Sequence, residues 1–269
     1  MRRPALGPDD MNDRYTFGDN DRAAARLKRL AELYEPVTRE LLMRGGLPRC
    51  SVAVDLGCGV GWTTRLLRDA LAPSRTVGLD ASERFVAEAR RRHGPKLEFV
   101  AHDVTRAPFP VQPDLLLCRF LLTHLRDIDG VLAVWSAAAS PGARLLVHET
   151  ESLRSEHPAL CRYYELVARL QGNYGQALDI GATLDGPFAR SPWNVLESRA
   201  VVFEVPAAQM TALHLANLRT WREDEHARRT FDRTELDGLD ATLERIVAGV
   251  EPAGVVTNVI RQIVAEVAP

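Results

Sequence analysis

Cysteine is scarce in this sequence, and its distribution argues against a disulfide framework. The 269 residues include four cysteines, Cys50, Cys58, Cys118 and Cys161, and their spacing matches no common set of metal ligands. Scattered thiols are typical of reducing compartments. The sequence also has no apolar run long enough to span a bilayer and no stretch typical of a secretion signal. We therefore expect a cytoplasmic protein that does not use a membrane as a partner.

An excess of charge of one sign is also absent. Lysine and arginine total 34 against 36 aspartate and glutamate residues, so the formal net charge is -2 at pH 7. Nucleic acids and anionic membranes are usually bound by strongly basic surfaces, so neither is expected as a partner. The apolar content of 46% and the charged content of 26% are typical of a globular protein.

The most informative stretch covers residues 52–71. Residues 52–54 predict a short buried strand that ends at Asp55, and three glycines follow at alternate positions, Gly57, Gly59 and Gly61. The next ten residues have the spacing of an amphipathic helix. Glycine lets the backbone adopt positive φ or approach a ligand closely, and a helix start offers free N–H groups. The pattern predicts a ligand-binding turn between a strand and a helix.

The details of this turn distinguish between two kinds of nucleotide site. A dinucleotide-binding turn reads Gly-x-Gly-x-x-Gly, with a pyrophosphate over the helix N-terminus. Here the third glycine comes one position earlier, and the carboxylate of Asp55 precedes the loop. A carboxylate repels a pyrophosphate but suits a ligand with a cationic amino group. The segment resembles the first motif of the class I S-adenosylmethionine-dependent methyltransferases, Glu/Asp-x-Gly-x-Gly-x-Gly.

Acidic residues also follow the next two predicted strands. Residues 76–80 are apolar up to Asp80, and residues 97–101 lead to His102 and Asp103. A carboxylate at the end of the second strand of a βαβ unit can accept hydrogen bonds from ribose hydroxyls, although Asp80 could instead cap the following helix. Strand and helix patterns alternate up to residue 151, which favours a doubly wound parallel sheet.

The resemblance to these methyltransferases covers residues 51–149 and implies specific contacts with the methyl donor. It places Asp55 and Gly57 beside the amino-acid part of S-adenosylmethionine, Asp80 at the ribose and Asp103 at the adenine amino group. The loop after the fourth strand would pass near the sulfonium. The residues expected at the donor are Tyr15, Asp55, Gly57, Cys58, Gly59, Asp80, Ala81, Asp103, Val104, Cys118 and Arg119. Tyr15 could act as a lid over the donor or pack against the first helix.

The same resemblance implies an α/β fold with a Rossmann-like, mostly parallel seven-stranded sheet and an antiparallel last strand. We expect N-terminal helices that form a lid over residues 1–46, a donor-binding core over 47–151, a helical cap over 152–192 and the rest of the core, with added helices, over 193–269. The cap follows a fifth strand predicted at 143–148. It could close the acceptor pocket or form a plain surface hairpin.

Three histidines are candidates for a catalytic base, namely His124 after the fourth strand, His148 at the end of the fifth strand, and His214 on a predicted helix. An unperturbed imidazole titrates near neutral pH and could take a proton from a hydroxyl acceptor. Each could instead have a structural role, in which its imidazole packs or orients neighbouring groups. Glu149, beside His148, could face the acceptor or be a solvated acid in a turn.

A carboxylate acceptor would need no base, and Arg119 or Arg219 could bind the anion. The loop after the fourth strand reads Cys-Arg-Phe-Leu at residues 118–121. The Asn/Asp-Pro-Pro-Tyr/Phe sequence typical of enzymes that methylate base amines in nucleic acids is not there. Carboxylates for a catechol-type metal site are also missing from this loop, so no metal is predicted.

Together these patterns favour methyl transfer from S-adenosylmethionine to a small-molecule acceptor, with oxygen ahead of nitrogen or carbon as the nucleophile. In outline the sequence is similar to the trans-aconitate methyltransferase-like and natural-product groups. Two other classes compete, a protein that keeps the donor pocket without transferring methyl and a nicotinamide-dependent oxidoreductase. The donor contacts implied by the resemblance are all present, which disfavours the first. The chain could be a monomer or a homodimer.

Overall fold

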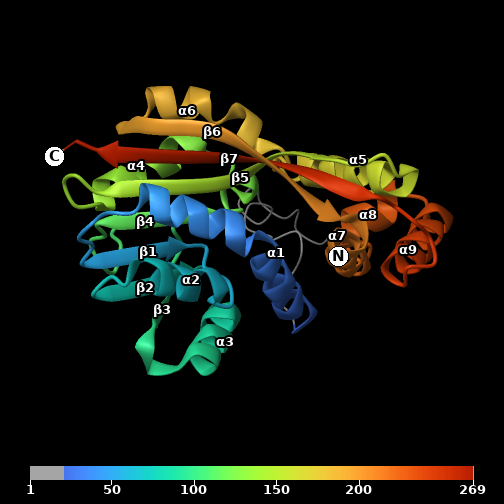
Figure 1. Ribbon diagram of the computed structural model, residues 1–269, viewed down its shortest axis with the longest axis horizontal. Coiled ribbons are helices and arrows are strands. Elements are labelled where there is room, and N and C mark those ends of the chain that lie inside the picture. Colours follow the sequence, from blue (N-terminus) through green and yellow to red (C-terminus); the bar gives the residue numbers. More distant parts are fainter. Residues whose placement is uncertain (1–20, 269) are drawn as a thin grey trace, which may run out of the picture.

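The computed structural model describes residues 21–268, with side chains from residue 25. Tyr15, the predicted lid residue, lies outside the described residues. A seven-stranded sheet with the order β3-β2-β1-β4-β5-β7-β6 runs through the molecule (Figure 1). The strands are β1 (Val52–Leu56), β2 (Arg75–Asp80), β3 (Glu98–Ala101), β4 (Leu115–Arg119), β5 (Arg144–Arg154), β6 (Trp193–Pro206) and β7 (Val255–Val267).

Strand pairing confirms the predicted Rossmann-like fold. Neighbouring strands from β3 to β5 are all parallel, whereas β7 runs antiparallel to both β5 and β6. The carboxyl ends of β1, β2 and β4 therefore lie at one edge, with β1 between the other two. In open α/β sheets this edge is where ligands bind.

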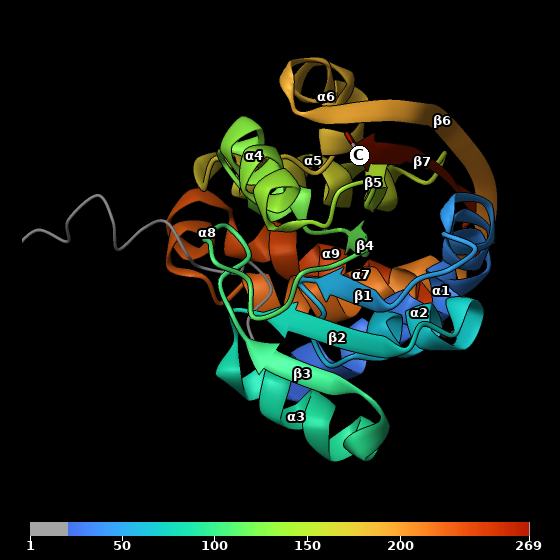
Figure 2. The ribbon, with the colours of Figure 1, turned by 90° about the vertical axis from the view of Figure 1, so that its left-hand side faces the viewer.

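The helices cover both faces of the sheet. They are α1 (Asp21–Gly45), α2 (Trp62–Leu71), α3 (Glu83–His93), α4 (Ile128–Ala138), α5 (Pro158–Asn173), α6 (Asp185–Arg190), α7 (Ala207–Trp221), α8 (Glu225–Thr230) and α9 (Arg233–Val247). Figure 2 shows α4 on one side of the sheet and α1 and α2 on the other. No helix within residues 21–268 is both long enough and apolar enough to cross a membrane.

The alternation of side chains along β4 explains these two layers. Leu115 and Leu117 pack with residues of α1 and α2, such as Leu41 and Leu67. Leu116, one position along, packs in the other cluster with α4. Successive side chains of a strand point to opposite faces, so a continuous apolar run is typical of a strand covered on both sides.

The N-terminal segment forms one helix where the sequence predicted more than one. α1 continues through Pro36 to Gly45. A proline inside a helix removes one backbone hydrogen bond, yet the second half of α1 is held to the sheet because Leu41 and Leu42 are fully buried. Packing on the sheet therefore overrides the local preference for a break.

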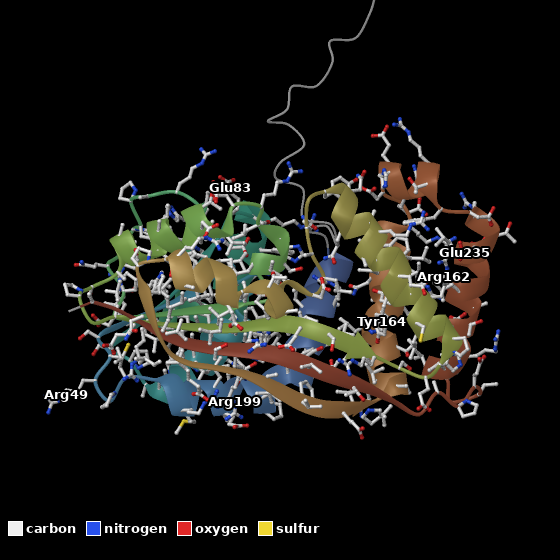
Figure 3. All side chains as sticks on the ribbon, turned by 90° about the horizontal axis from the view of Figure 1, so that it is seen from above. Arg49, Glu83, Arg162, Tyr164, Arg199 and Glu235 are labelled. Atoms are coloured by element: carbon white, nitrogen blue, oxygen red, sulfur yellow. The ribbon has the colours of Figure 1, made fainter. Side chains whose placement is uncertain are left out.

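The predicted cap over residues 152–192 is divided differently in the structure. β5 continues past the predicted end of the strand to Arg154. α5 joins α7 and α9 in a second hydrophobic cluster, and Arg162 of α5 reaches Glu235 of α9, with Nε 2.6 Å from the carboxylate (Figure 3). α6 packs instead near α4. The helical layer beyond the sheet edge thus comes from α5 together with the C-terminal helices.

Candidate donor and acceptor site

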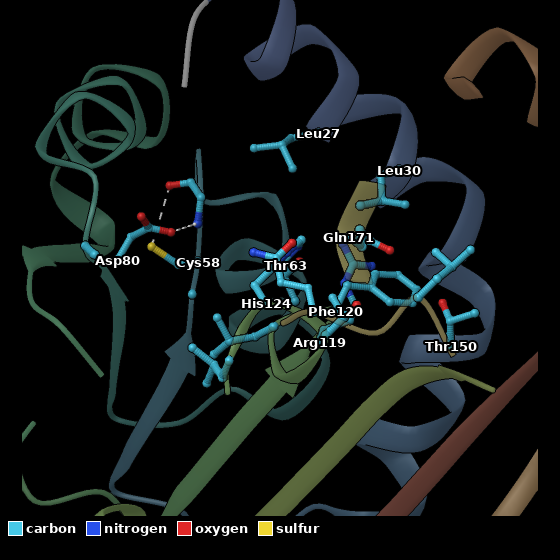
Figure 4. A pocket seen from close by; sticks show the side chains of 18 of the residues that line it. Leu27, Leu30, Cys58, Thr63, Asp80, Arg119, Phe120, His124, Thr150 and Gln171 are labelled. Atoms are coloured by element: carbon cyan, nitrogen blue, oxygen red, sulfur yellow. Dashed lines mark hydrogen bonds between the residues drawn. The ribbon is translucent and has the colours of Figure 1, made fainter. Parts of the chain in front are cut away.

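A cavity of about 1120 Å³ lies at the carboxyl ends of β1, β2 and β4. One end is lined by the glycine loop after β1 and by three acids, Asp55 and Asp80 near the ends of β1 and β2, and Asp103 after β3. The other end is lined by α1, α5 and α7. The loop after β4 lies between the two, and Figure 4 shows its Arg119, Phe120 and His124 in the same pocket as Asp80 and Gln171.

The glycine loop has the conformation that its sequence predicts. Gly57 and Gly59 have φ of 65° and 53°, a region in which glycine carries no steric penalty. A Cβ on Gly57 would also come within 2.8 Å of a methyl carbon of Leu121. Cys58 lines the cavity, and its N–H donates to the Leu79 carbonyl (2.9 Å), which ties the loop to β2.

Asp80 connects the loops that follow β1 and β2. Its carboxylate accepts hydrogen bonds from the N–H of Gly59 (2.7 Å) and the N–H of Ser82 (2.8 Å). The helix α3 is capped by Ser82, whose hydroxyl accepts from Phe85 N–H, so Asp80 is not the cap. Asp80 and Ala81 both line the cavity. The negative charge of Asp80 is thus presented beside the glycine loop.

Asp55 is a buried residue that lines the glycine-loop end of the cavity. The hydroxyl of Thr64, on α2, donates to its carboxylate at 2.7 Å. Burial raises the pKa of Asp55 to about 7, and the hydrogen bond from Thr64 and the charge of Arg119 oppose that rise. A buried carboxyl with this pKa accommodates a cation readily, because a positive charge nearby favours its ionised form.

The raised pKa predicts how Asp55 affects stability. Since folding raises the pKa from 3.8 to about 7, the contribution of Asp55 is present below its ordinary pKa and is lost as the pH rises through about 7. Without ligand, the wild-type protein should therefore lose stability relative to Asp55→Asn between about pH 5 and about pH 8. Urea unfolding of both proteins, with the surface variant Asp129→Asn as control, measures this. A difference that is constant over the range would contradict the prediction.

Asp103 and Val104 lie where the sequence places them, in the cavity wall after β3. The carboxylate of Asp103 accepts hydrogen bonds from the N–H and hydroxyl of Thr105 (2.9 and 2.7 Å) and pairs with Arg106. The carbonyl of Val104 accepts from the indole N–H of Trp135 at 2.9 Å. This bond anchors the loop to α4.

The loop after β4 is held by a residue whose role the sequence did not reveal. One carboxylate oxygen of Glu149, on β5, accepts hydrogen bonds from the backbone N–H groups of Leu121 (2.7 Å) and Leu122 (2.8 Å). Phe120, just before them, has a φ of 52°. Glu149 is fully buried, and burial raises its pKa to about 7. It therefore neither faces the acceptor nor lies in a solvated turn.

Cys118 does not line the cavity, contrary to the expected donor contact. Its thiol is fully buried and lies 3.6 Å from the carboxylate of Glu149. The side chain of the next residue, Arg119, does line the cavity. Its guanidinium is 5.6 Å from the ring centroid of Phe120, and burial lowers its pKa to about 10. Arg119 and Asp55 thus put opposite charges at one end of the cavity.

The three candidate bases occupy different places. His124 and His214 line the cavity, and burial lowers their pKa values to about 4 and about 3. His148 is fully buried outside the cavity lining and packs against Phe120 and Tyr34, with ring centroids 5.1 and 6.0 Å away. The prediction of His148 as a catalytic base is therefore wrong, and the residue has a packing role. Its side chain is buried because β5 continues past it between β4 and β7.

The position of Arg219 also contradicts its predicted role in binding an anionic acceptor. It does not line the cavity, and it pairs with Asp240 and Glu244 of α9. Among residues 21–268, no group of three or more His, Cys, Asp or Glu residues is arranged to hold a metal ion.

Comparisons with known proteins agree with this geometry. The family model described as "Methyltransferase domain" matches residues 53–142. A trans-aconitate 2-methyltransferase from Variovorax paradoxus (strain S110) is 37% identical over 110 residues, which are 40% of this chain and 42% of that relative. The chain thus matches less than half the length of that relative.

Solved structures share the fold at low sequence identity. A methyltransferase candidate from Bacillus halodurans C-125 has a TM-score of 0.57 and 13% identity, covering 86% of this chain and 98% of that one. A phosphoethanolamine N-methyltransferase from Haemonchus contortus, solved with phosphomonomethylethanolamine and S-adenosylhomocysteine, has a TM-score of 0.51 and 15% identity, covering 86% and 52%. The match of residues 53–142 to a methyltransferase domain, together with the glycine loop and the sheet order, supports a class I S-adenosylmethionine-dependent methyltransferase.

Proposed function

We propose that this protein transfers a methyl group from S-adenosylmethionine to a small-molecule acceptor, with an oxygen atom as the nucleophile. The observation that carries the proposal is one continuous cavity, with acids at the glycine-loop end and the polar side chains of Gln171, His214 and Asn217 at the other. The loop after β4 lies between these ends. A donor and an acceptor could therefore meet beside this loop.

The residues at the glycine-loop end fit the donor. Asp55 and Arg119 suit the ammonium and carboxylate of an amino acid, Asp80 suits the ribose hydroxyls, and Asp103 suits the adenine amino group. When bound, S-adenosylmethionine supplies a methyl carbon that its sulfonium has already activated. The main task of the protein is then to align the methyl carbon of the donor with the nucleophile of the acceptor and to exclude water.

His124 is the residue that we propose as the base for a hydroxyl acceptor. It lies in the loop between the two ends of the cavity and is half-buried. Its pKa of about 4 keeps the imidazole in the neutral form near pH 7, which is the form that can accept a proton, and a hydrogen bond with Gln176 favours the protonated form. The positive charge of Arg26 also opposes protonation of His124.

Replacing His124 with alanine should lower kcat by about 10²- to 10⁴-fold, because the acceptor hydroxyl loses its base. Donor affinity should stay within about twofold of wild type, since the donor contacts lie elsewhere. Steady-state kinetics and calorimetry measure the two quantities, with His226→Ala on α8 as control. A near-normal rate at saturating acceptor would make His124 structural.

The proposed reaction is tested by incubating the protein with methyl-labelled S-adenosylmethionine and a panel of small hydroxylated and carboxylated molecules. Trans-aconitate belongs in the panel because a relative is named for it. Label transferred to an oxygen of any member supports the proposal. Label found only on nitrogen or carbon would correct the nucleophile, and donor binding without transfer to any acceptor would favour a protein that keeps the pocket without methylating.

A further inference from the structure

Buried polar side chains at the acceptor end of the cavity each have one atom without a hydrogen-bond partner among the described residues. Gln171 on α5 and His214 and Asn217 on α7 all line the cavity, with exposed fractions of 1%, 4% and 7%. Each has one buried atom without a hydrogen-bond partner among the described residues, namely Oε1 of Gln171, Nδ1 of His214 and Oδ1 of Asn217. An unpaired buried polar group is destabilising, so three such atoms along the wall of one cavity point to a missing ligand.

Neighbouring aromatic rings fix the orientation of His214. Its Nε2 lies 2.9 Å from the hydroxyl of Tyr164, and its ring stacks on Tyr163 with centroids 4.5 Å apart. When the Tyr164 hydroxyl donates to Nε2, the neutral imidazole carries its hydrogen on Nδ1. The ring then offers a donor, while the amides of Gln171 and Asn217 can present either an oxygen or an N–H.

We propose that Gln171, His214 and Asn217 form the acceptor-recognition subsite and that they bind a hydroxyl group on an uncharged, largely apolar acceptor. A hydroxyl matches such a cluster because it both donates and accepts hydrogen bonds. Apolar side chains from α5 and α7, including Val167, Met210 and Leu213, line the same end of the cavity and suit an apolar body. The inference rests on the proposed function, because it assigns this end of the cavity to the acceptor.

An anionic acceptor is the competing outcome. Arg26 of α1 lines the cavity, and its charge affects both His124 and Tyr163. The three residues of the proposed subsite carry no charge, since burial holds His214 neutral. A subsite for several carboxylates would need more cations than this end of the cavity provides among the described residues. Recognition through the three polar side chains therefore predicts a preference for an uncharged acceptor, whereas recognition through Arg26 predicts a preference for an anionic one.

The test uses three probes with one ring skeleton, 2-naphthol, 2-naphthoate and naphthalene. Their binding to the protein saturated with S-adenosylhomocysteine is measured by ligand-observed NMR. We expect 2-naphthol to bind at least about fivefold more tightly than the other two, because only it supplies a hydroxyl to the cluster. Gln171→Met and Asn217→Leu should each weaken 2-naphthol about three- to tenfold and naphthalene less than about twofold. Gln112→Met, an exposed amide outside the cavity, is the matched control.

Thermal unfolding without ligand separates recognition from a structural role. Gln171→Met removes an unpaired buried oxygen at similar shape, so its midpoint should stay the same or rise by about 2–4 °C. A midpoint that falls by several degrees would show that Gln171 holds the fold, against the proposal. The proposed subsite would also be overturned if the protein preferred 2-naphthoate and lost that binding in Arg26→Met. It would be overturned as well if 2-naphthol did not bind, or if none of the variants changed its binding. If S-adenosylhomocysteine did not bind, the proposed function would be refuted instead. Titration of the three probes without it would still test whether the proposed subsite binds a hydroxyl group.

Discussion

Replacing Glu149 with alanine is expected to lower the free energy of unfolding by about 2–6 kcal/mol, the sum of two unpaired buried donors. In the wild-type protein one carboxylate oxygen accepts from the N–H groups of Leu121 and Leu122. Alanine leaves both groups without that acceptor, because it removes the fully buried side chain of Glu149. The loop that carries Arg119 and His124 should then lose its fixed position, so methyl transfer should fall as well.

Glu149→Gln is the matched control, because an amide oxygen can accept the same two hydrogen bonds. Burial raises the pKa of Glu149 from 4.5 to about 7, so its contribution to stability is present at low pH and is lost as the pH rises through about 7. The free energy of unfolding of Glu149→Gln should therefore rise relative to that of the wild-type protein as the pH rises from about 6 to about 8. Urea unfolding of the three proteins at several pH values gives both results. Equal stability of the alanine and glutamine variants would contradict the role given to Glu149.

Asp80→Ala should weaken binding of S-adenosylmethionine by about 1–3 kcal/mol, or about 5- to 150-fold, because the ribose hydroxyls lose a charged acceptor. The substitution also releases the N–H of Gly59, which the carboxylate holds at 2.7 Å, so the glycine loop should loosen. Both effects reduce affinity. Calorimetric titration at fixed pH and salt measures the change.

Asp237→Ala is the control for this titration, since Asp237 is an exposed acid on α9 that pairs with Arg222 far from the glycine loop. Asp80→Asn separates the two effects, because it removes the charge but keeps an oxygen that can accept from Gly59. Unchanged donor affinity in Asp80→Ala would remove the ribose assignment and leave Asp80 as a residue that only ties two loops together.

The parts of the site that depend on short-range sequence could be predicted. Glycines at alternate positions after a buried strand indicate a turn with positive φ, and Asp80 follows an apolar strand. Such patterns involve residues within about ten positions of one another. The order of the parallel strands then brings the acids together at one edge. This is why Asp55, Asp80 and Asp103 all line one cavity.

The parts that depend on distant pairing could not be predicted. β7 pairs with β5 from Arg144 to Arg154, and this pairing extends β5 past its predicted end and buries His148 and Glu149. Nothing near His148 in the sequence indicates a partner more than a hundred positions away. A clue was available for Glu149, because an acid at the end of an apolar strand needs donors if it is buried. The polar cluster of Gln171, His214 and Asn217 likewise forms only when α5 and α7 pack together.

The decisive measurement is a calorimetric titration of the wild-type protein with S-adenosylmethionine and with S-adenosylhomocysteine, with reduced nicotinamide cofactor titrated alongside. We expect micromolar binding of the first two ligands and no binding of the third. Binding of S-adenosylmethionine should also release a proton near neutral pH, because its ammonium favours the ionised form of Asp55. Failure of both sulfur compounds to bind, or binding of the nicotinamide cofactor in their place, would contradict the assignment of this cavity to a methyl donor.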